Sequence, residues 1–231
     1  GSHCAGSDVR HLESDAVREL IRYSSRMSGS RTKLSARMRD MIDIVDESDV
    51  WAAADGNSHI GREHVKKAIH ERTERINGIE QEMLDMYRER KYIIDVHRRC
   101  VGQVNGLSVV EIGGFAFGRP CRITASSYIG RSGIIDIERE ANMSGNLHSK
   151  GVMIISGYIG ETYAKDIPLS LAGHICFEQM YSHIDGDSAP IAELYAVLSS
   201  ISGIPLKQGI AVTGSLNQKG EVQPVGGINE K

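Results

Sequence analysis

Residues 185–231 read DGDSAPIAELYAVLSSISGIPLKQGIAVTGSLNQKGEVQPVGGINEK, and this stretch decides how the second part of the chain folds. A polar turn around Ser188 leads into apolar residues that recur at steps of three and four, which predicts a helix. These apolar residues are Ile191, Leu194, Tyr195, Leu198 and Ile201. A short buried strand is then expected at 210–212, followed by a hairpin around Lys219-Gly220 and the start of another helix at 228–231.

Ser188 stands at the start of a helix, and a glycine-rich segment ends at Lys231, so a Ser-Lys pair could be assembled here. Taken alone, Ser188 is interpreted as an N-capping residue and Lys231 as a solvated surface lysine. A helix N-terminus supplies backbone N–H groups and the positive end of a dipole, where an oxyanion could form. Gly186 would let a substrate carbonyl come close to the backbone. A lysine accepts a proton only when it is neutral, so burial must lower its pKa from about 10.4. Such a pair would carry out acyl transfer, and the motifs around the two residues decide between this interpretation and the structural one.

Three ordered motifs resemble the Lon family of serine peptidases: GDSA around Ser188, AVTGSL at 211–216 and GEVQPVGGINEK at 220–231. In that family the serine of the first motif is the nucleophile, and the lysine that ends the last motif is its general base. Lys231 follows Ser188 by 43 positions, which is the family's usual separation. The likeness is to the branch with GDSA rather than GPSA.

The resemblance implies an ATP-dependent serine endopeptidase that degrades unfolded or damaged proteins. It assigns Thr213 as the hydrogen-bond partner of the lysine amine, and Gly186 and Asp185 as supporting residues. Pro190 departs from the family pattern, which usually has serine, glycine or alanine there, although proline is tolerated in the first turn of a helix. The alternative is an assembly or chaperone module that kept the peptidase fold without its activity.

Other sites in the same stretch are less well supported. A Ser-His-Asp triad from Ser188, His183 and Asp185 is poor, because triad members normally come from separate elements. Asp185 and Asp187 are too few hard ligands for a metal, so no metal site is expected. Three further polar residues are expected to be structural or solvated. These are His148, Lys150 and Glu178.

Residues 1–91 predict a small helical bundle. Helices are expected from Ser14, from Leu34-Ser35 to a stop at 55–57, and from Ile60 through to Arg90. This segment resembles the helical lid of AAA+ ATPases, in which SARMRDMI at 35–42 matches the helix whose arginine contacts ATP phosphates. The matching position is Arg37, the expected nucleotide-binding residue. The chain has no GxxxxGK[ST] phosphate loop, so no cofactor is expected on it, and ATP with magnesium is expected for the intact parent protein.

Residues 92–231 change to short β-type runs between glycine-rich turns, so the domain boundary is expected near Lys91. The fold class is α+β: a helical lid followed by an α/β Lon-type proteolytic domain with a mixed sheet. A hairpin section is expected largely at the periphery, and the resemblance implies that the family's domain continues beyond Lys231. The expected strands are 92–96, 101–104, 107–112, 122–128, 134–138 and 169–177, with a turn at Gly113-Gly114 and a helix at 151–164.

The composition excludes several classes of partner. The 231 residues carry a net charge of −3, and residues 1–91 contain 16 Lys and Arg against 17 Asp and Glu, so nucleic acid is an unlikely partner. No apolar run approaches the roughly 20 residues of a membrane span. The four cysteines are far apart, which favours reduced thiols and a cytoplasmic protein. The family resemblance implies a homohexamer that takes unfolded proteins or peptides as substrates.

Overall fold

The computed structural model describes all residues except 1–3, 5, 7, 113, 114, 167 and 169. It divides the chain into two compact units, Gly1–Glu82 and Met83–Lys231. The division falls earlier than the boundary expected near Lys91. The reason is that the end of helix α5 (Gly78–Arg88) belongs to the second unit, where the Tyr87 hydroxyl donates to the Pro120 carbonyl over 2.6 Å.

The first unit is helical, as its sequence predicts. Its helices are α2 (Ser14–Met27), α3 (Met38–Ala54) and α4 (Arg62–Ile76), followed by the start of α5. The prediction of one long third helix that reaches Arg90 is wrong. Helix α4 ends at Ile76, and a separate helix, α5, begins at Gly78. The Asn77 amide caps α4 by donating to the Thr73 carbonyl (2.9 Å), and its side chain donates to Glu74 (3.1 Å).

Buried apolar side chains from α2, α3 and α4 form the core of this unit. Ile60, just before α4, is fully buried and pairs with Leu12 in an isolated β-bridge. This bridge brings the segment before α2 beside the segment before α4, so the two helix starts are held together. The buried core comprises Cys4, Ala16, Leu20, Ile44, Val45, Ala52, Ile60, Val65 and Ala68.

The second unit is built on a five-stranded mixed sheet in the order β4-β5-β3-β2-β7. The pairs β2–β3 and β3–β5 are antiparallel, whereas β4–β5 and β2–β7 are parallel. The mixed sheet was predicted. The five strands are β2 (Gln103–Ile112), β3 (Phe115–Ile129), β4 (Gly133–Asp136), β5 (Leu171–Glu178) and β7 (Ala211–Val212).

The expectation of a peripheral hairpin is wrong, because the hairpin β2–β3 occupies the middle of the sheet. The two runs expected at 101–104 and 107–112 join into the single strand β2, and the run at 92–96 is not a strand. The turn expected at Gly113-Gly114 lies outside the described residues, as does Leu169 at the start of the strand expected at 169–177. On either side of the hairpin, β5 pairs with residues 122–129 of β3, and β7 pairs with Asn105 and Gly106 of β2.

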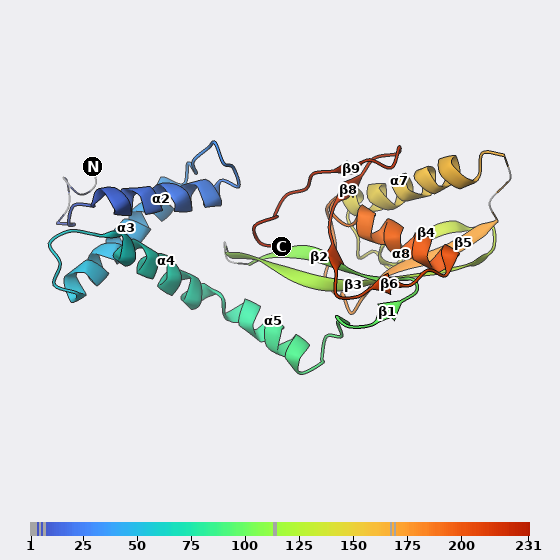
Figure 1. Cartoon of the computed structure of the whole chain (residues 1–231), viewed down its shortest axis with the longest axis horizontal. Coiled ribbons are helices and arrows are strands. Elements are labelled where there is room, and N and C mark those ends of the chain that lie inside the picture. The colour runs from blue at the N-terminus through green and yellow to red at the C-terminus, as the bar shows by residue number, and fades with distance from the viewer. Residues whose placement is uncertain (1–3, 5, 7, 113–114, 167, 169) are drawn as a thin grey trace. The chain divides into compact units, whose positions relative to one another are not determined.

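Two helices, α7 (Asn146–Tyr163) and α8 (Pro190–Ser202), cover one face of this sheet (Figure 1). Alternate residues of β5 are buried against them, among them Ile175 and Phe177, as the two-residue period of a strand requires. The helices contribute Val152, Ile155, Ile159, Ile191, Ala192, Leu194, Ala196 and Val197 to the common core.

Smaller elements complete the unit. The expected hairpin around Lys219-Gly220 is present as β8–β9, and the helix start expected at 228–231 is only a turn. Asp136 ends β4 and caps the short helix that follows, since its Oδ1 accepts from the Glu138 amide (3.1 Å). These elements are β1 (Arg99–Cys100), α6 (Ile137–Glu140), β6 (Leu206–Lys207), β8 (Ser215–Leu216) and β9 (Val222–Gln223).

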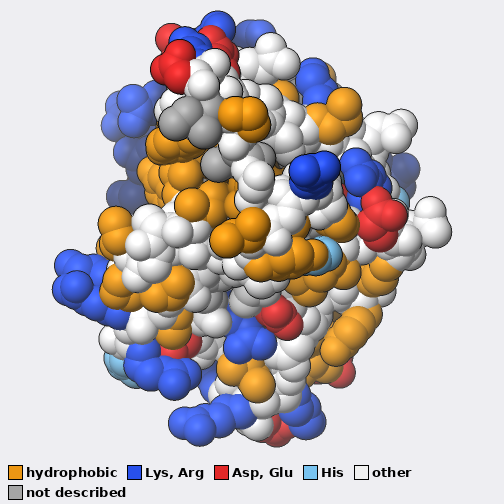
Figure 2. All heavy atoms as spheres, turned by 90° about the vertical axis from the view of Figure 1, so that its right-hand side faces the viewer, with side chains coloured by type: hydrophobic (Ala, Val, Ile, Leu, Met, Phe, Trp, Pro, Cys, Tyr) orange, Lys and Arg blue, Asp and Glu red, His pale blue; other side chains and the backbone are white. Residues whose placement is uncertain are grey.

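The surface of the chain carries scattered apolar side chains. Figure 2 shows hydrophobic side chains over the middle of one face, with many of the Lys and Arg side chains around them. Exposed apolar residues of the second unit include Tyr128, Ile129 and Tyr163. Such residues are common on globular proteins and indicate no function by themselves. Within the described residues, no helix has the length and apolar character needed to cross a bilayer.

Helices α7 and α8 meet at Gly151 and Pro190. A Cβ added to Gly151 would lie 2.6 Å from Pro190 Cγ, which is closer than real Cβ contacts allow. The proline that departs from the family pattern therefore fits because a glycine faces it. Pro190 is also the first residue of α8, where its missing N–H costs little.

We predict that Gly151→Ala destabilises the second unit. Alanine in a helix interior is normally more favourable than glycine by about 1 kcal/mol, but overpacking at this contact should cost about 1–3 kcal/mol. The matched control is Gly157→Ala in the same helix, where no atom lies within 4 Å of the added Cβ, so stability should rise or stay unchanged. Urea unfolding of both variants measures the difference, and equal stabilities would contradict this packing.

Candidate active site

Ser188 lies in the turn immediately before α8. Its carbonyl accepts two hydrogen bonds from the segment that follows β7: one from the Thr213 hydroxyl (3.1 Å) and one from the Gly214 amide (2.9 Å). The Ile191 amide donates in return to the Gly214 carbonyl (3.2 Å). Ser188 was expected at the helix N-terminus, and the N-cap residue is its neighbour Ala189. Within the described residues, the Ser188 hydroxyl has no hydrogen-bond partner, so it is available to a substrate.

A small pocket of about 40 Å³ opens beside Ser188. Gly186, at its edge, has φ +118°, a conformation that favours glycine, and no atom lies within 4 Å of an added Cβ. The backbone there is open to an approaching group. The pocket is lined by Gly106, Leu107, Ser108, Cys121, Ile123, His148, Phe177, Met180, Ile184, Asp185, Gly186, Ser188 and Ala189.

Lys231 reaches the same region from the last turn of the chain. Its Nζ donates to Thr213 Oγ1 over 2.9 Å, which is the contact expected from the sequence. Burial lowers the pKa of Lys231, and the negative charge of Asp187 opposes this by raising it. The lowered pKa favours the neutral amine that a general base requires. The structure records no direct hydrogen bond between Lys231 Nζ and Ser188 Oγ, and Thr213 is the link between the two residues.

The Lys231 segment sits against β3 because position 118 is a glycine. A Cβ on Gly118 would overlap the Glu230 carbonyl oxygen and lie 2.9 Å from Lys231 Cα. The turn is held internally by the Lys231 amide, which donates to the Gly227 carbonyl (3.0 Å). A side chain at position 118 would therefore move the lysine away from the pocket.

The two hydrogen bonds of the Thr213 hydroxyl determine which groups donate and which accept at this site. The Ser188 carbonyl can only accept, so the Thr213 hydroxyl must donate its one hydrogen to it. Thr213 Oγ1 can then only accept from Lys231. A neutral lysine amine has two hydrogens and one lone pair, and when one hydrogen points to Thr213 the lone pair remains available to another hydroxyl.

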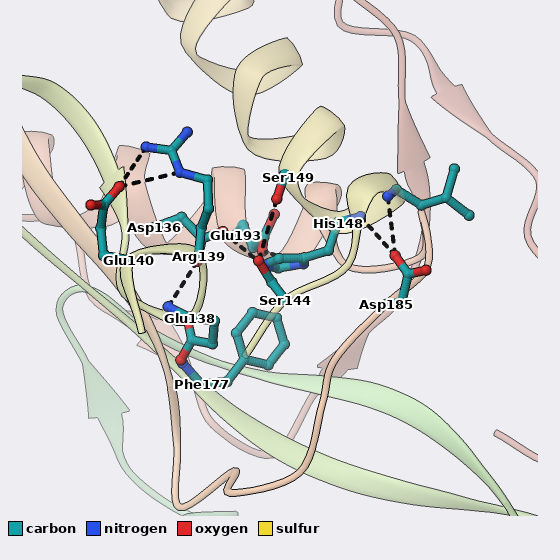
Figure 3. A network of polar contacts seen from close by, with 11 residues as sticks. Asp136, Glu138, Arg139, Glu140, Ser144, His148, Ser149, Phe177, Asp185 and Glu193 are labelled. Carbon is teal, nitrogen blue, oxygen red and sulfur yellow. Dashed lines mark hydrogen bonds and ion pairs between the residues drawn. The ribbon is translucent and has the colours of Figure 1, made fainter. Parts of the chain in front are cut away.

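Asp185 connects the serine turn to helix α7 (Figure 3). Its Oδ1 accepts from the amides of Leu147 (3.1 Å) and His148 (3.3 Å), which are otherwise unsatisfied donors in the first turn of α7. The Gly186 amide and these two amides lower the pKa of Asp185. Asp185 is thus a cap on a distant helix, and not only the solvated turn residue that the sequence indicates.

The remaining predicted residues lie apart from this site or beside it. His183 is exposed and does not line the pocket, and Glu178 accepts from the Thr124 hydroxyl (2.7 Å). Arg37, in the first unit, is exposed just before α3, and none of the recorded ion pairs of the described residues involves its guanidinium. One exposed arginine does not by itself define a phosphate site.

Sequence reasoning missed a buried polar group behind the pocket. His148 is 1% exposed, and its ring nitrogens face Asp136 Oδ2 (3.3 Å) and Glu193 Oε1 (3.5 Å). Burial raises the pKa of Glu193 to about 8. The sequence feature that could have indicated this buried group is Glu193. It is a single acidic residue between Ala192 and Leu194 in an apolar helix, where charged residues are rare.

Comparison with known proteins agrees with this arrangement. Residues 11–75 match the family described as Archaeal LonB, AAA+ ATPase LID domain. Residues 79–231 match the family described as Lon protease (S16) C-terminal proteolytic domain. The two matches follow the order of the two units.

Individual relatives point the same way. The chain is 36% identical over 219 residues to a Lon protease homologue of Escherichia coli (strain K12), covering 94% of this chain and 37% of that protein. It is 33% identical over 229 residues to an Archaeal Lon protease of Archaeoglobus fulgidus, covering 96% of this chain and 35% of that protein. The chain thus spans about a third of the length of these relatives. It belongs to the Lon protease family, with a lid unit followed by a Lon-type proteolytic domain.

Proposed function

We propose that this chain is the lid and proteolytic part of an ATP-dependent serine endopeptidase, in which Ser188 is the nucleophile and Lys231 its general base. The observation that carries the proposal is the Thr213 hydroxyl, which contacts both the Ser188 carbonyl and the Lys231 amine. The lowered pKa of Lys231, caused by burial, supports the role of this residue as a base. The relative from Archaeoglobus fulgidus is named Archaeal Lon protease, which supports peptide-bond hydrolysis.

The chemistry is acyl transfer through a covalent intermediate. Lys231 takes the hydroxyl proton of Ser188, and Oγ attacks the carbonyl carbon of the peptide. The oxyanion accepts from the Ser188 amide, which has no acceptor within the described residues. The Gly186 amide already lies against the Asp185 carboxylate, so it is the weaker candidate for this role. Lys231 then gives its proton to the leaving amine, and a water molecule releases the acyl group.

The first prediction concerns the nucleophile. Ser188→Ala should lower peptide cleavage by about 10⁴-fold or more, because the covalent route is lost. Thermal unfolding should stay close to wild type, since the Ser188 carbonyl keeps both of its hydrogen bonds. The control is Ser182→Ala, an exposed serine of the same loop. If cleavage by Ser188→Ala is unchanged, Ser188 is not the nucleophile. If the wild type itself cleaves no peptide, the chain is the alternative, an assembly or chaperone module without peptidase activity.

The pH dependence tests the general base. The Asp187 carboxylate raises the pKa of Lys231 by attracting its ammonium form, so Asp187→Asn should lower that pKa further. The neutral amine then appears at lower pH, and the rising limb of the kcat/KM profile should move to lower pH. Glu221→Gln removes the same charge from an exposed position that does not act on Lys231 and should leave the profile in place. A shift to higher pH in Asp187→Asn would contradict the assignment.

We propose ATP coupling because residues 11–75 match a AAA+ lid and Arg37 is exposed at the start of α3. A cation that contacts a phosphate contributes charge-assisted hydrogen bonds. The assembly and substrates proposed from the family are a homohexamer and unfolded proteins.

In a protein that also carries the ATPase core, Arg37→Ala should slow ATP-stimulated degradation of a whole protein several-fold. It should leave cleavage of a short unstructured peptide nearly unaffected, since that reaction needs only the proteolytic unit. Arg31→Ala, another exposed arginine before α3, is the control. Equal losses in both assays would mean that Arg37 has a structural role.

A further inference from the structure

Four ionisable side chains are buried together next to the pocket, and one of them, His148, lines it. Figure 3 shows the four residues. Asp136 ends β4, Glu138 lies on α6, His148 on α7 and Glu193 on α8. Their exposed fractions are 0%, 4%, 1% and 0%. The three carboxylates can carry three negative charges, and the one imidazole can carry only one positive charge. Buried charges are normally paired or bound to a metal. The proposed Ser-Lys chemistry uses none of the four.

Two of the carboxylates each accept a backbone hydrogen bond through one oxygen. Asp136 Oδ1 accepts from the Glu138 amide (3.1 Å), and Glu138 Oε1 accepts from the Phe177 amide (2.7 Å). Within the described residues, their second oxygens, Asp136 Oδ2 and Glu138 Oε2, have no hydrogen-bond partner, and neither has His148 Nε2. One ligand atom from each of these three residues lies within 4.8 Å of the other two. The backbone therefore fixes one oxygen of each carboxylate. The second oxygen of Glu138 accepts no hydrogen bond, and the second oxygen of Asp136 faces only the His148 ring.

The imidazole is fixed in the same manner. His148 Nε2 faces Asp136 Oδ2 at 3.3 Å, and the opposite nitrogen, Nδ1, faces Glu193 Oε1 at 3.5 Å. Histidines that bind metals commonly direct their second ring nitrogen to a carboxylate, which sets the tautomer and orients the ring. The ring of His148 also contacts Phe177 edge-on, with centroids 5.3 Å apart.

We propose that Asp136, Glu138 and His148 bind one divalent transition-metal ion, and that Glu193 positions His148 for this role. Imidazole nitrogen and carboxylate oxygen are both zinc ligands in proteins, and sites with three protein ligands leave a fourth position for water. An ion of two positive charges offsets the excess of buried carboxylates. It links β4, α6 and α7 directly, and α8 through Glu193. The proposal is independent of the Ser-Lys chemistry, because its effect is on stability and can be measured without a substrate.

The experiment compares the chelator-treated chain with the same chain after addition of zinc chloride and desalting. Bound zinc, measured by elemental analysis, should become nearly stoichiometric, and the Tm should rise. In Glu138→Gln both effects should be lost, while the metal-free Tm stays close to that of the chelated wild type. Glutamine keeps the size of the side chain and an oxygen that accepts from the Phe177 amide, but it is a poor zinc ligand.

Two further variants distinguish zinc bound at this cluster from zinc bound elsewhere on the protein. Glu140→Gln changes an exposed glutamate of the same helix, paired with Arg139, and should keep zinc and the Tm shift. Glu193→Gln should weaken zinc binding by about 10–100-fold, as removal of an orienting carboxylate does. If the chelated wild type gains neither zinc nor Tm, or if Glu138→Gln binds zinc as well as wild type, the proposal is wrong. The wild-type measurement decides this even where a variant fails to fold.

Discussion

The second unit depends on a short set of hydrogen bonds between the turn before α8 and the segment after β7. The Ser188 carbonyl accepts from Thr213 and Gly214, and the Gly214 carbonyl accepts from Ile191. These bonds bring together residues that lie more than twenty positions apart and that belong to no common strand. They also satisfy backbone groups at the start of α8 that would otherwise lack partners. Because they hold Thr213 in place, they determine where the amine of Lys231 can lie.

The lowered pKa of Lys231 follows from this geometry and from the close packing behind it. A lysine that reaches a partner from the surface would keep most of its hydration. Here Gly118 lets the backbone of Glu230 and Lys231 lie directly on β3, and the amine is partly desolvated beside Thr213. Gly118 therefore helps to position Lys231, as Thr213 does, although Gly118 contacts no reacting group. Both act by fixing where the lysine is, which is how a rigid framework prepares a catalytic group.

The sequence predicted the helices and the motifs better than the arrangement of the strands. The three- and four-residue steps of Ile191, Leu194 and Leu198 are local, and α8 was found from them. The position of hairpin β2–β3 in the sheet depends on β5 and β7, which are far along the chain, so periodicity could not show that it is central. The break at Asn77 was missed because one residue, whose amide and side chain turn back onto α4, is enough to end a helix.

The buried cluster also depends on contacts between distant parts of the chain, because its four members lie on β4, α6, α7 and α8. Local sequence patterns therefore could not predict it.

The cluster lies next to the pocket that contains Ser188. His148 lines the pocket that contains Ser188, and Glu193 lies on the helix that begins two residues after Ser188. The backbone of the same His148 is held by Asp185, from the serine turn itself. The turn and the cluster therefore hold the start of α7 from two sides. Because His148 belongs to the cluster and also lines the pocket, a change in the position of its ring would change the wall of the pocket without changing any group proposed to react.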